Sequence, residues 1–189
     1  MTSRPLTDFE QILLGIIAAG PSSGYALKKD LAASPAGVYQ PSSGALYPAL
    51  RRLERSGLLR SEPGVSAGSR PRRVYHVTAA GQAAHEQWVR AAVDPATVAR
   101  DLGLHLMRFV FMERLLPPDQ VAAFLASLGH ALEAFVAGVE QYRREHEPDA
   151  GRRHQGLALE HGIAVYRASL DWTEHAQRVL AAEPAAGQR

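Results

Sequence analysis

The residues best suited to do chemistry are arginines, and they are concentrated in one part of the chain. Residues 42–77 contain seven arginines against two glutamates. One group recurs in steps of four residues and therefore lies on one face of a helix: Tyr47, Arg51 and Arg55. A second group lies beside a stretch rich in glycine and serine: Arg70, Arg72 and Arg73. Guanidinium groups bind phosphate oxygens through paired hydrogen bonds, so both groups favour contact with a nucleic-acid backbone.

The first group requires a helix over residues 42–55. Leu46, Leu50 and Leu53 recur at steps of four and three, which places them on the face opposite the basic residues. Ser42 or Ser43 is suited to cap the first turn, and Gly57 follows the last turn, where a left-handed cap is expected. Pro48 removes a backbone hydrogen bond, so we expect the helix to start late or to bend there.

The second group requires a hairpin. Residues 58–62 and 72–77 are predicted strands, and residues 63–71 form the loop between them. Thr78 is placed to cap a further helix.

Two helices are predicted upstream of this segment. Thr7 and Glu10 have the spacing of a capping box at the start of an apolar run that ends at Gly20 and Pro21. Ser22 or Ser23 caps a second helix that extends to Leu31. Three helices followed by a hairpin is the order of a winged helix-turn-helix.

Candidate DNA-binding residues follow from this order. We expect Tyr47 and Arg51 near bases and the loop arginines on phosphates. The full set is Ser42, Ser43, Tyr47, Arg51, Arg52, Arg55, Tyr25, Lys28, Arg70, Arg72 and Arg73. Two alternatives stay open: the arginines only solubilise an exposed hairpin, or the winged helix serves protein contacts instead of DNA.

Charge and composition divide the chain into two parts. Residues 1–90 hold 11 Lys and Arg against 6 Asp and Glu, whereas residues 91–189 hold 10 against 13.

The chain has no cysteine, which excludes disulfides and thiolate metal sites. We find no signal-peptide pattern and no apolar run approaching the ~20 residues that span a bilayer, so we expect a cytoplasmic protein without membrane contact.

The N-terminal part resembles a known family. Residues 12–31, 44–59 and 72–81, which read ILLGIIAAGPSSGYALKKDL, GALYPALRRLERSGLL and RRVYHVTAAG, are similar to the PadR family of bacterial transcriptional repressors. The resemblance implies a homodimer of winged helices on a palindromic operator in double-stranded DNA, with a recognition helix over residues 42–55 and a wing over residues 63–73. It also implies release from DNA by a small aromatic or cationic effector. Many members have threonine where this chain has Ala45, so the operator sequence does not transfer.

Residues 94–189 are predicted to be helical and to form a dimerisation and possible effector domain, after a DNA-binding domain of residues 1–93. The expected fold is thus mainly α with a small β-hairpin. The last helix carries two apolar stripes, and two stripes favour dimerisation, although closure of an intramolecular bundle stays open. The candidate dimer residues are Leu159, Ile163, Val165, Tyr166, Leu170, Trp172 and Val179. The candidate effector residues are Trp88, Phe109, Met112, Tyr166 and Trp172, which could equally be core.

The eight histidines are scattered, with no HExxH pattern, and the sequence lacks a P-loop, a GxSxG elbow and a dinucleotide-binding glycine motif. We therefore expect no metal, no cofactor and no enzymatic activity. A histidine-based metal sensor or enzyme is the weakest alternative.

Overall fold

The computed structural model describes residues 4–33, 43–64, 72–146 and 153–182. The chain divides into two compact units, Met1–Ala91 and Ala92–Arg189. Both units are mainly helical, and the first also contains a small antiparallel sheet, as the sequence predicts. Ser42 and Arg70, two predicted DNA-binding residues, lie outside the described residues, as does most of the predicted hairpin loop.

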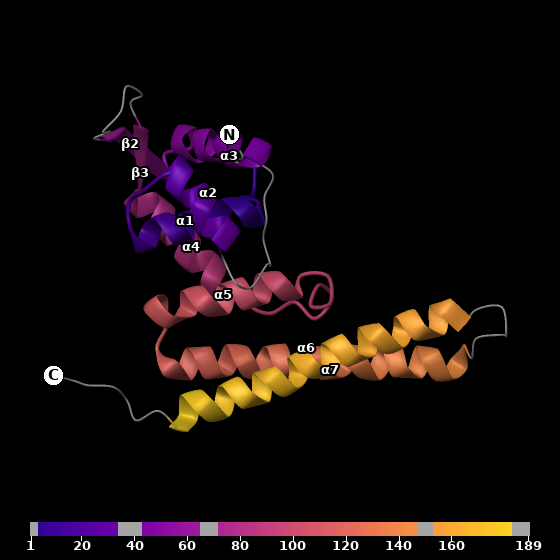
Figure 1. The fold of residues 1–189 in the computed structure, drawn as a ribbon. Coiled ribbons are helices and arrows are strands. Elements are labelled where there is room, and N and C mark those ends of the chain that lie inside the picture. Colours follow the sequence, from indigo (N-terminus) through magenta and orange to yellow (C-terminus); the bar gives the residue numbers. More distant parts are fainter. Residues whose placement is uncertain (1–3, 34–42, 65–71, 147–152, 183–189) are drawn as a thin grey trace. The chain divides into compact units, whose positions relative to one another are not determined.

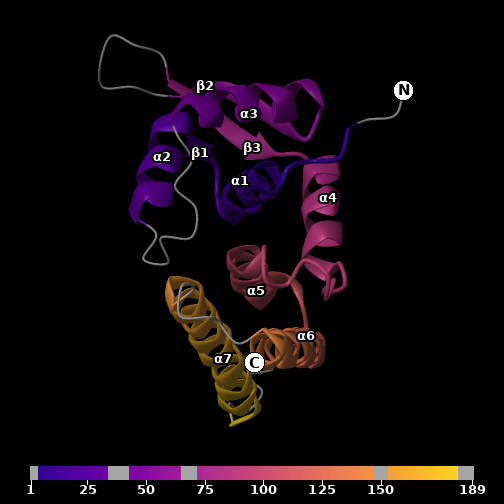
Figure 2. The same cartoon turned by 90° about the vertical axis from the view of Figure 1, so that its right-hand side faces the viewer.

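The first helix begins and ends where the sequence predicts. Helix α1 (Asp8–Ala19) has Thr7 as its N-cap, and the capping box with Glu10 is complete. Gly20 follows its last turn. The helix is central to its unit, with Ile12, Leu13 and Leu14 fully buried, and it contacts α3 (Ser43–Arg55), α4 (Ala79–Arg90) and β3 (Arg72–Val77). Figure 2 shows α3 and β3 on one side of α1, with α4 beside it.

The link between the first two helices contains a strand that the sequence did not indicate. Strand β1 (Ser22–Ser23) pairs with β3, Ser22 opposite Tyr75 and Ser23 opposite Val74. Ser23 also caps helix α2 (Gly24–Ala33), because its Oγ accepts a hydrogen bond from the backbone N–H of Ala26 at 3.2 Å. Capping by Ser23 is therefore confirmed.

Helix α3 corrects the expectation for Pro48. The helix begins at Ser43 and continues through Pro48, so the predicted late start is wrong. An interior proline costs about 3 kcal/mol. Leu46, Leu50 and Leu53 are almost completely buried, and each buried leucine contributes about 1.5–3 kcal/mol, which together outweighs that cost.

The hairpin consists of β2 (Leu59–Gly64) and β3, and the strand order in the sheet is β1-β3-β2. Strand β2 extends to Pro63 and Gly64, which the sequence assigned to the loop. Proline is compatible with this strand because β2 lies at an edge of the sheet.

Both ends of the hairpin are fixed to the neighbouring helices. Gly57 has a φ of 72°, the left-handed conformation predicted after α3. Thr78 caps α4 by accepting a hydrogen bond from Gly81 N–H, and its hydroxyl donates to the carbonyl of Gly57 at 2.7 Å. A Cβ on Gly81 would lie 2.1 Å from the carbonyl oxygen of Leu58, so only glycine fits this close approach.

The second unit contains helices α5 (Leu102–Leu115), α6 (Pro118–Glu145) and α7 (Arg153–Ala182). Helix α7 runs back along α6 (Figure 1), and α5 also contacts α6. Ion pairs join the long helices at Arg167 and Glu140 and at Arg143 and Glu160. Apolar residues of α6 fill the core: Val121, Phe124, Leu125, Leu128, Leu132 and Val136.

Helix α6 also corrects an expectation. Among the described helices it is long and apolar enough to cross a membrane, with a mean hydropathy of 1.5 over 18 residues. The sequence has no uninterrupted apolar run of that length, but the small residues between the large apolar ones raise the mean hydropathy of this helix. Because one face of α6 is buried against α5 and α7, the helix also has the pattern of a core helix, and it is weak evidence for a membrane span.

Candidate nucleic-acid interface

The exposed face of α3 carries the predicted basic residues. Leu46, Leu50 and Leu53 point into the core, which leaves Arg51 and Arg55 exposed and Tyr47 46% exposed on the other face. Arg55 donates its Nε–H to the carbonyl of Arg51, one turn back in the same helix. The helix thus separates apolar packing from a cationic surface, as its periodicity predicts.

A cavity of about 350 Å³ lies where α2, α3 and β3 meet. Its lining residues, which define the α2–α3–β3 cavity, are Ser23, Gly24, Tyr25, Tyr47, Arg51, Arg73 and Tyr75. Four of them, from three separate elements, are predicted DNA-binding residues: Tyr25, Tyr47, Arg51 and Arg73. Tyrosine hydroxyls and guanidinium groups are hydrogen-bond donors that commonly contact DNA phosphates, so the cavity has the chemistry of a phosphate contact.

Ser23, Gly24 and Tyr75 line the cavity but were not predicted to bind DNA. A Cβ at Gly24 would lie 2.7 Å from Cε1 of Tyr47, so the absence of a side chain allows the tyrosine ring to approach α2. Tyr75 is buried on β3, and burial raises the pKa of its hydroxyl. The charges of Arg73, Glu54 and Arg51 also act on that hydroxyl. The two arginines lower the pKa of this hydroxyl, against the effect of burial, whereas Glu54 raises it.

Arg73 is held by a carboxylate of α3. Its guanidinium lies 3.3 Å from Oε1 of Glu54, and Ser61 of β2 donates a hydrogen bond to the same oxygen at 2.5 Å. Glu54 therefore connects α3 with both strands of the hairpin. The Arg73 side chain stays 61% exposed, so it keeps donors that can reach a phosphate.

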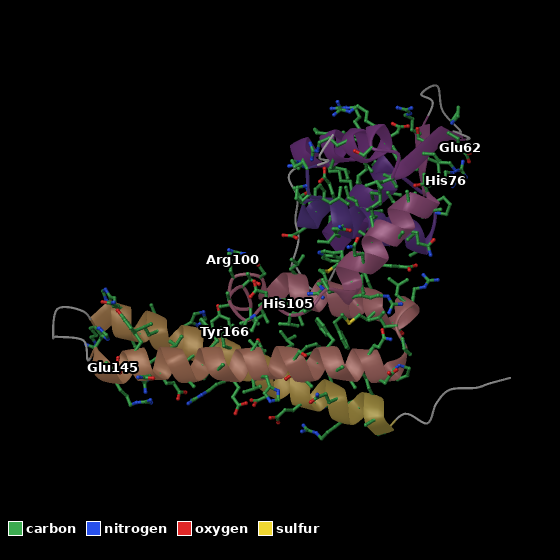
Figure 3. The ribbon with its side chains drawn as sticks, turned by 180° about the vertical axis from the view of Figure 1, so that it is seen from behind. Glu62, His76, Arg100, His105, Glu145 and Tyr166 are labelled. Atoms are coloured by element: carbon green, nitrogen blue, oxygen red, sulfur yellow. The ribbon has the colours of Figure 1, made fainter. Side chains whose placement is uncertain are left out.

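The strand pair carries a second set of charges beside this one. Arg60 and His76 both lie near Glu62, with the nearest nitrogen-to-oxygen distances at 3.2 and 2.9 Å. Figure 3 shows Glu62 and His76 on the hairpin. Since Arg60 and Glu62 are mostly exposed, this pair contributes little to stability.

Arg52 differs from the other arginines of α3 because it is bound to a buried carboxylate. Its Nε lies 2.7 Å from Oε1 of Glu10, whose side chain is 2% exposed. Arg4 and Thr7 also donate to this carboxylate. Burial raises the pKa of Glu10, but the hydrogen bonds from Thr7 and Arg52 outweigh it and leave the pKa lowered. Arg52 thus joins α3 to α1.

The remaining candidates are distributed over the same unit. Ser43 begins α3, and Arg72 begins β3 opposite Gly64. Lys28 and Tyr25 are exposed on α2, Tyr25 at 63%. Of the DNA-binding candidates whose side chains the structure describes, Lys28, Arg52 and Arg55 do not line the α2–α3–β3 cavity.

Comparison with known proteins agrees with this arrangement. Residues 13–87, which include α2, α3 and the hairpin, match the transcriptional regulator PadR-like family. The N-terminal unit belongs to the PadR-like family. Residues 105–181 of this PadR-like chain match a second family, the virulence activator alpha C-terminal domain. The two matches correspond to the two compact units.

Two curated relatives of this PadR-like chain come from Mycobacterium tuberculosis. One, a transcriptional regulator, is 59% identical over 46 residues, which are 24% of this chain and 42% of the relative. The chain therefore spans less than half the length of that relative. The other, a probable transcriptional regulator, is 23% identical over 172 residues, which cover 84% of this chain and 90% of the relative. Both are described as regulators of transcription and neither as an enzyme.

Solved structures of PadR-like proteins resemble the chain over most of its length. Bacillus subtilis PadR in complex with operator DNA is 15% identical, with 94% of this chain and 99% of that chain covered and a TM-score of 0.46. A PadR-like regulator from Bacillus cereus is 20% identical, with 95% and 99% covered and a TM-score of 0.42.

The two apolar stripes on α7 of the PadR-like chain differ in exposure. In the first stripe, Ile163 is buried, and Tyr166 packs edge-to-face on Phe135 with ring centroids 4.7 Å apart. The hydroxyl of Tyr166 also donates to the carbonyl of Ala99. The second stripe leaves Val165 and Val179 more than 40% exposed. Trp172, the third residue of this stripe, instead packs on Phe109.

The candidate effector residues fall in both units. Trp88 lies on α4 in the first unit, whereas Phe109, Met112, Tyr166 and Trp172 lie in the second. Phe109 and Trp172 pack edge-to-face at 5.3 Å, and Met112 is 1% exposed. In the described part of the second unit, these side chains therefore make core contacts.

A buried polar pair lies on α5 beside these residues. His105 and Arg108 are 4% and 5% exposed, and Nδ1 of His105 lies 3.5 Å from a terminal nitrogen of Arg108. Arg108 also stacks over the ring of Phe124 at 5.2 Å. Burial, followed by the charge of Arg108, lowers the pKa of His105, which favours a neutral imidazole.

Proposed function

We propose that this PadR-like, DNA-binding transcriptional regulator is a cytoplasmic repressor that binds a palindromic operator as a homodimer. The observation that supports this most directly is the α2–α3–β3 cavity, which gathers Tyr25, Tyr47, Arg51 and Arg73 from three elements. Donors from separate elements can contact one stretch of DNA backbone together. A solvated charge cluster would not require this convergence.

Two sets of residues have different roles, one in base contacts and the other in phosphate contacts. Tyr47 and Arg51, on the exposed face of α3, lie near bases in the major groove, as recognition helices do. Arg73, together with Arg70 and Arg72 of the hairpin, binds phosphates. Phosphate contacts set affinity and its salt dependence, whereas base contacts set sequence preference.

The test measures DNA affinity at several salt concentrations. Arg73→Ala should weaken all DNA sequences about equally and reduce the slope of log affinity against log salt by about 0.9. Arg51→Ala should also change base preference, with a loss of about 1–3 kcal/mol on the operator. Arg114→Ala, which removes an exposed arginine from α5 in the other unit, is the matched control. Unchanged slope in an Arg70, Arg72 and Arg73 triple variant would contradict the proposal.

The operator itself is best sought by footprinting on the DNA that flanks the gene. A two-fold dimer should protect two half-sites about 10 base pairs, or a multiple of this, apart. The dimer would form through the exposed stripe of α7 with Val165 and Val179. A monomer by light scattering at micromolar concentration would contradict this part of the proposal. The absence of salt-dependent DNA binding would favour the alternative, a winged helix that serves protein contacts.

Release by a small aromatic or cationic effector completes the proposal. A ligand that binds only one arrangement of the dimer shifts the spacing of the two recognition helices away from the half-site spacing. The aromatic residues Phe109, Tyr166 and Trp172 would line its site. Ligands that bind tightly and leave operator affinity unchanged would refute this mechanism.

A further inference from the structure

Glu54 is an acidic residue beside the basic surface that is proposed to contact DNA. It lies on α3 three positions after Arg51, and residues three apart are neighbours on a helix. Arg51 and Arg73 line the α2–α3–β3 cavity, whereas Glu54 lies behind them, outside the lining. A negative charge at this place opposes phosphate binding unless it has a second effect that favours it.

Three side chains of the hairpin lie on the sheet face that meets Glu54. Arg73 and Tyr75 are two positions apart on β3, and Ser61 of β2 is paired with Tyr75. Alternate residues of a strand share a face of the sheet, and so do directly paired residues. Ser61 donates to Oε1 of Glu54 at 2.5 Å, and a terminal nitrogen of Arg73 donates to the same oxygen at 3.3 Å. Tyr75 is close enough for the charge of Glu54 to raise the pKa of its hydroxyl.

The contact with Glu54 restricts the side chain of Arg73. A guanidinium has five N–H donors, and this contact uses one terminal nitrogen. The side chain stays 61% exposed and also lines the α2–α3–β3 cavity, so donors remain for a phosphate there. An unrestrained arginine on a surface samples many rotamers, and immobilising it on binding reduces affinity. A contact that already holds it in the free protein removes part of that loss.

We infer that Glu54 is a positioning residue for DNA binding, because it holds the guanidinium of Arg73 at the α2–α3–β3 cavity before DNA arrives. The inference rests on the proposed function, in which Arg73 binds a phosphate of the DNA backbone. Ordering one such side chain in advance changes affinity by a factor of about 2–12. Repulsion between Glu54 and a phosphate one Debye length away, about 8 Å, changes it by a factor of about 1.4 across water. Positioning therefore outweighs repulsion.

The experiment is a double-mutant cycle in DNA affinity, with the full chain and a mixed-sequence DNA duplex long enough for two half-sites. A phosphate contact carries no sequence information, so the duplex does not have to contain the operator. Glu54→Gln keeps the size of the side chain and an acceptor for Ser61, but it removes the charge that holds Arg73. It should weaken binding about 3-fold in the wild type, and change it by less than about 1.5-fold in an Arg73→Ala background.

A matched control comes from the same hairpin. Glu62→Gln removes a carboxylate that is 52% exposed and paired with Arg60 instead of Arg73. This variant loses the same charge as Glu54→Gln without loss of the contact with Arg73. It should bind the duplex at least as tightly as the wild type.

A second measurement tests the positioning without DNA. NMR relaxation of the Nε–H group of Arg73 reports how firmly this side chain is held on the picosecond-to-nanosecond timescale. The order parameter of this group should fall in Glu54→Gln and stay unchanged in Glu62→Gln. A purely structural role of Glu54 would lower the free energy of unfolding but would not give this difference together with the coupling in the cycle.

Three outcomes would overturn the inference while the proposed function stands. The first is a Glu54→Gln variant that binds the duplex as tightly as the wild type or more tightly, because repulsion would then prevail. The second is an equal loss in the wild-type and Arg73→Ala backgrounds, because Glu54 would then act through the fold and not through Arg73. The third is an unchanged order parameter of Arg73 in Glu54→Gln. A wild type that does not bind the duplex at any salt concentration would refute the proposed function and this role together.

Discussion

The contact between Glu10 and Arg52 allows a quantitative prediction, because each oxygen of this buried carboxylate has its own donors. Oε1 accepts from Nε of Arg52 at 2.7 Å, and Oε2 accepts from the backbone N–H of Thr7 at 2.8 Å. Glu10→Gln keeps the shape of the side chain but replaces one oxygen with an NH₂ group. Whichever way the new amide is turned, its NH₂ group then faces either the N–H of Thr7 or the Nε–H of Arg52, which are both donors.

The cost follows from which donor loses its acceptor. A buried donor without an acceptor costs about 1–3 kcal/mol, and charge-assisted bonds lie at the upper end. The Arg52 side chain is 41% exposed, so water can solvate it when the amide turns its NH₂ group that way. The Thr7 bond then survives, and we expect Glu10→Gln to lower the free energy of unfolding by about 2 kcal/mol.

The assay is urea unfolding of the N-terminal unit. Trp88 and Trp172 lie in different units, so a Trp172→Phe background leaves Trp88 as the fluorescent reporter of the first unit. Glu62→Gln is the control, since that carboxylate is 52% exposed and should cost less than about 0.5 kcal/mol. Surface substitutions without a structural role usually change the free energy of unfolding by less than about 0.5 kcal/mol. A Glu10→Gln variant whose free energy of unfolding lies within that margin of its parent would therefore refute this account of the contact.

The same contact predicts a dependence on pH. The folded-state pKa of Glu10 is lowered from the ordinary value of 4.5, so its stabilisation is present above that value. The stabilisation is lost as the pH falls through the folded pKa. The difference in stability between wild type and Glu10→Gln should therefore shrink below about pH 4.5. A difference that stays constant to pH 3 would contradict the charged state of Glu10.

Three further outcomes can be measured. Gly81→Ala should destabilise by more than about 3 kcal/mol in urea unfolding, because its Cβ would meet the backbone oxygen of Leu58 at 2.1 Å. Gly24→Ala should cost less stability, because the obstacle is the side chain of Tyr47, but should weaken DNA binding by displacing that ring; equal DNA affinity would contradict the contact. Below about pH 6.5 the free energy of unfolding should decrease, because His105 is protonated at a higher pH in the unfolded chain than in the folded one. His105→Phe should reduce this decrease.

The features that the sequence predicted are local ones. The caps at Thr7, Ser23, Gly57 and Thr78 each depend on residues within a few positions, and all four are present. The leucine stripe of α3 was also predicted, because helical periodicity places its members without reference to the rest of the fold. From these local features the winged-helix order and the exposed face of the recognition helix follow.

The features that the sequence did not predict join residues far apart. Glu10 and Arg52 are 42 positions apart, and Arg73 and Glu54 are 19 apart. Nothing in the surroundings of Arg52 distinguished it from Arg51 and Arg55, so all three were predicted to contact DNA. The continuation of α3 through Pro48 was missed for a similar reason, since it depends on leucine burial against other elements. The contacts of Arg52 and the course of α3 through Pro48 depend on tertiary packing, which the residues next to them in the sequence do not indicate.

The short strand β1 limits how the protein can be altered by insertion. Links between helices ordinarily tolerate added residues. Here Ser22 and Ser23 are paired with Tyr75 and Val74, and Ser23 also caps α2. One residue added between Gly20 and Gly24 would have to displace either the strand pairing or the cap. Tags and added loops therefore belong elsewhere in the chain, and relatives that differ in length should keep this link constant.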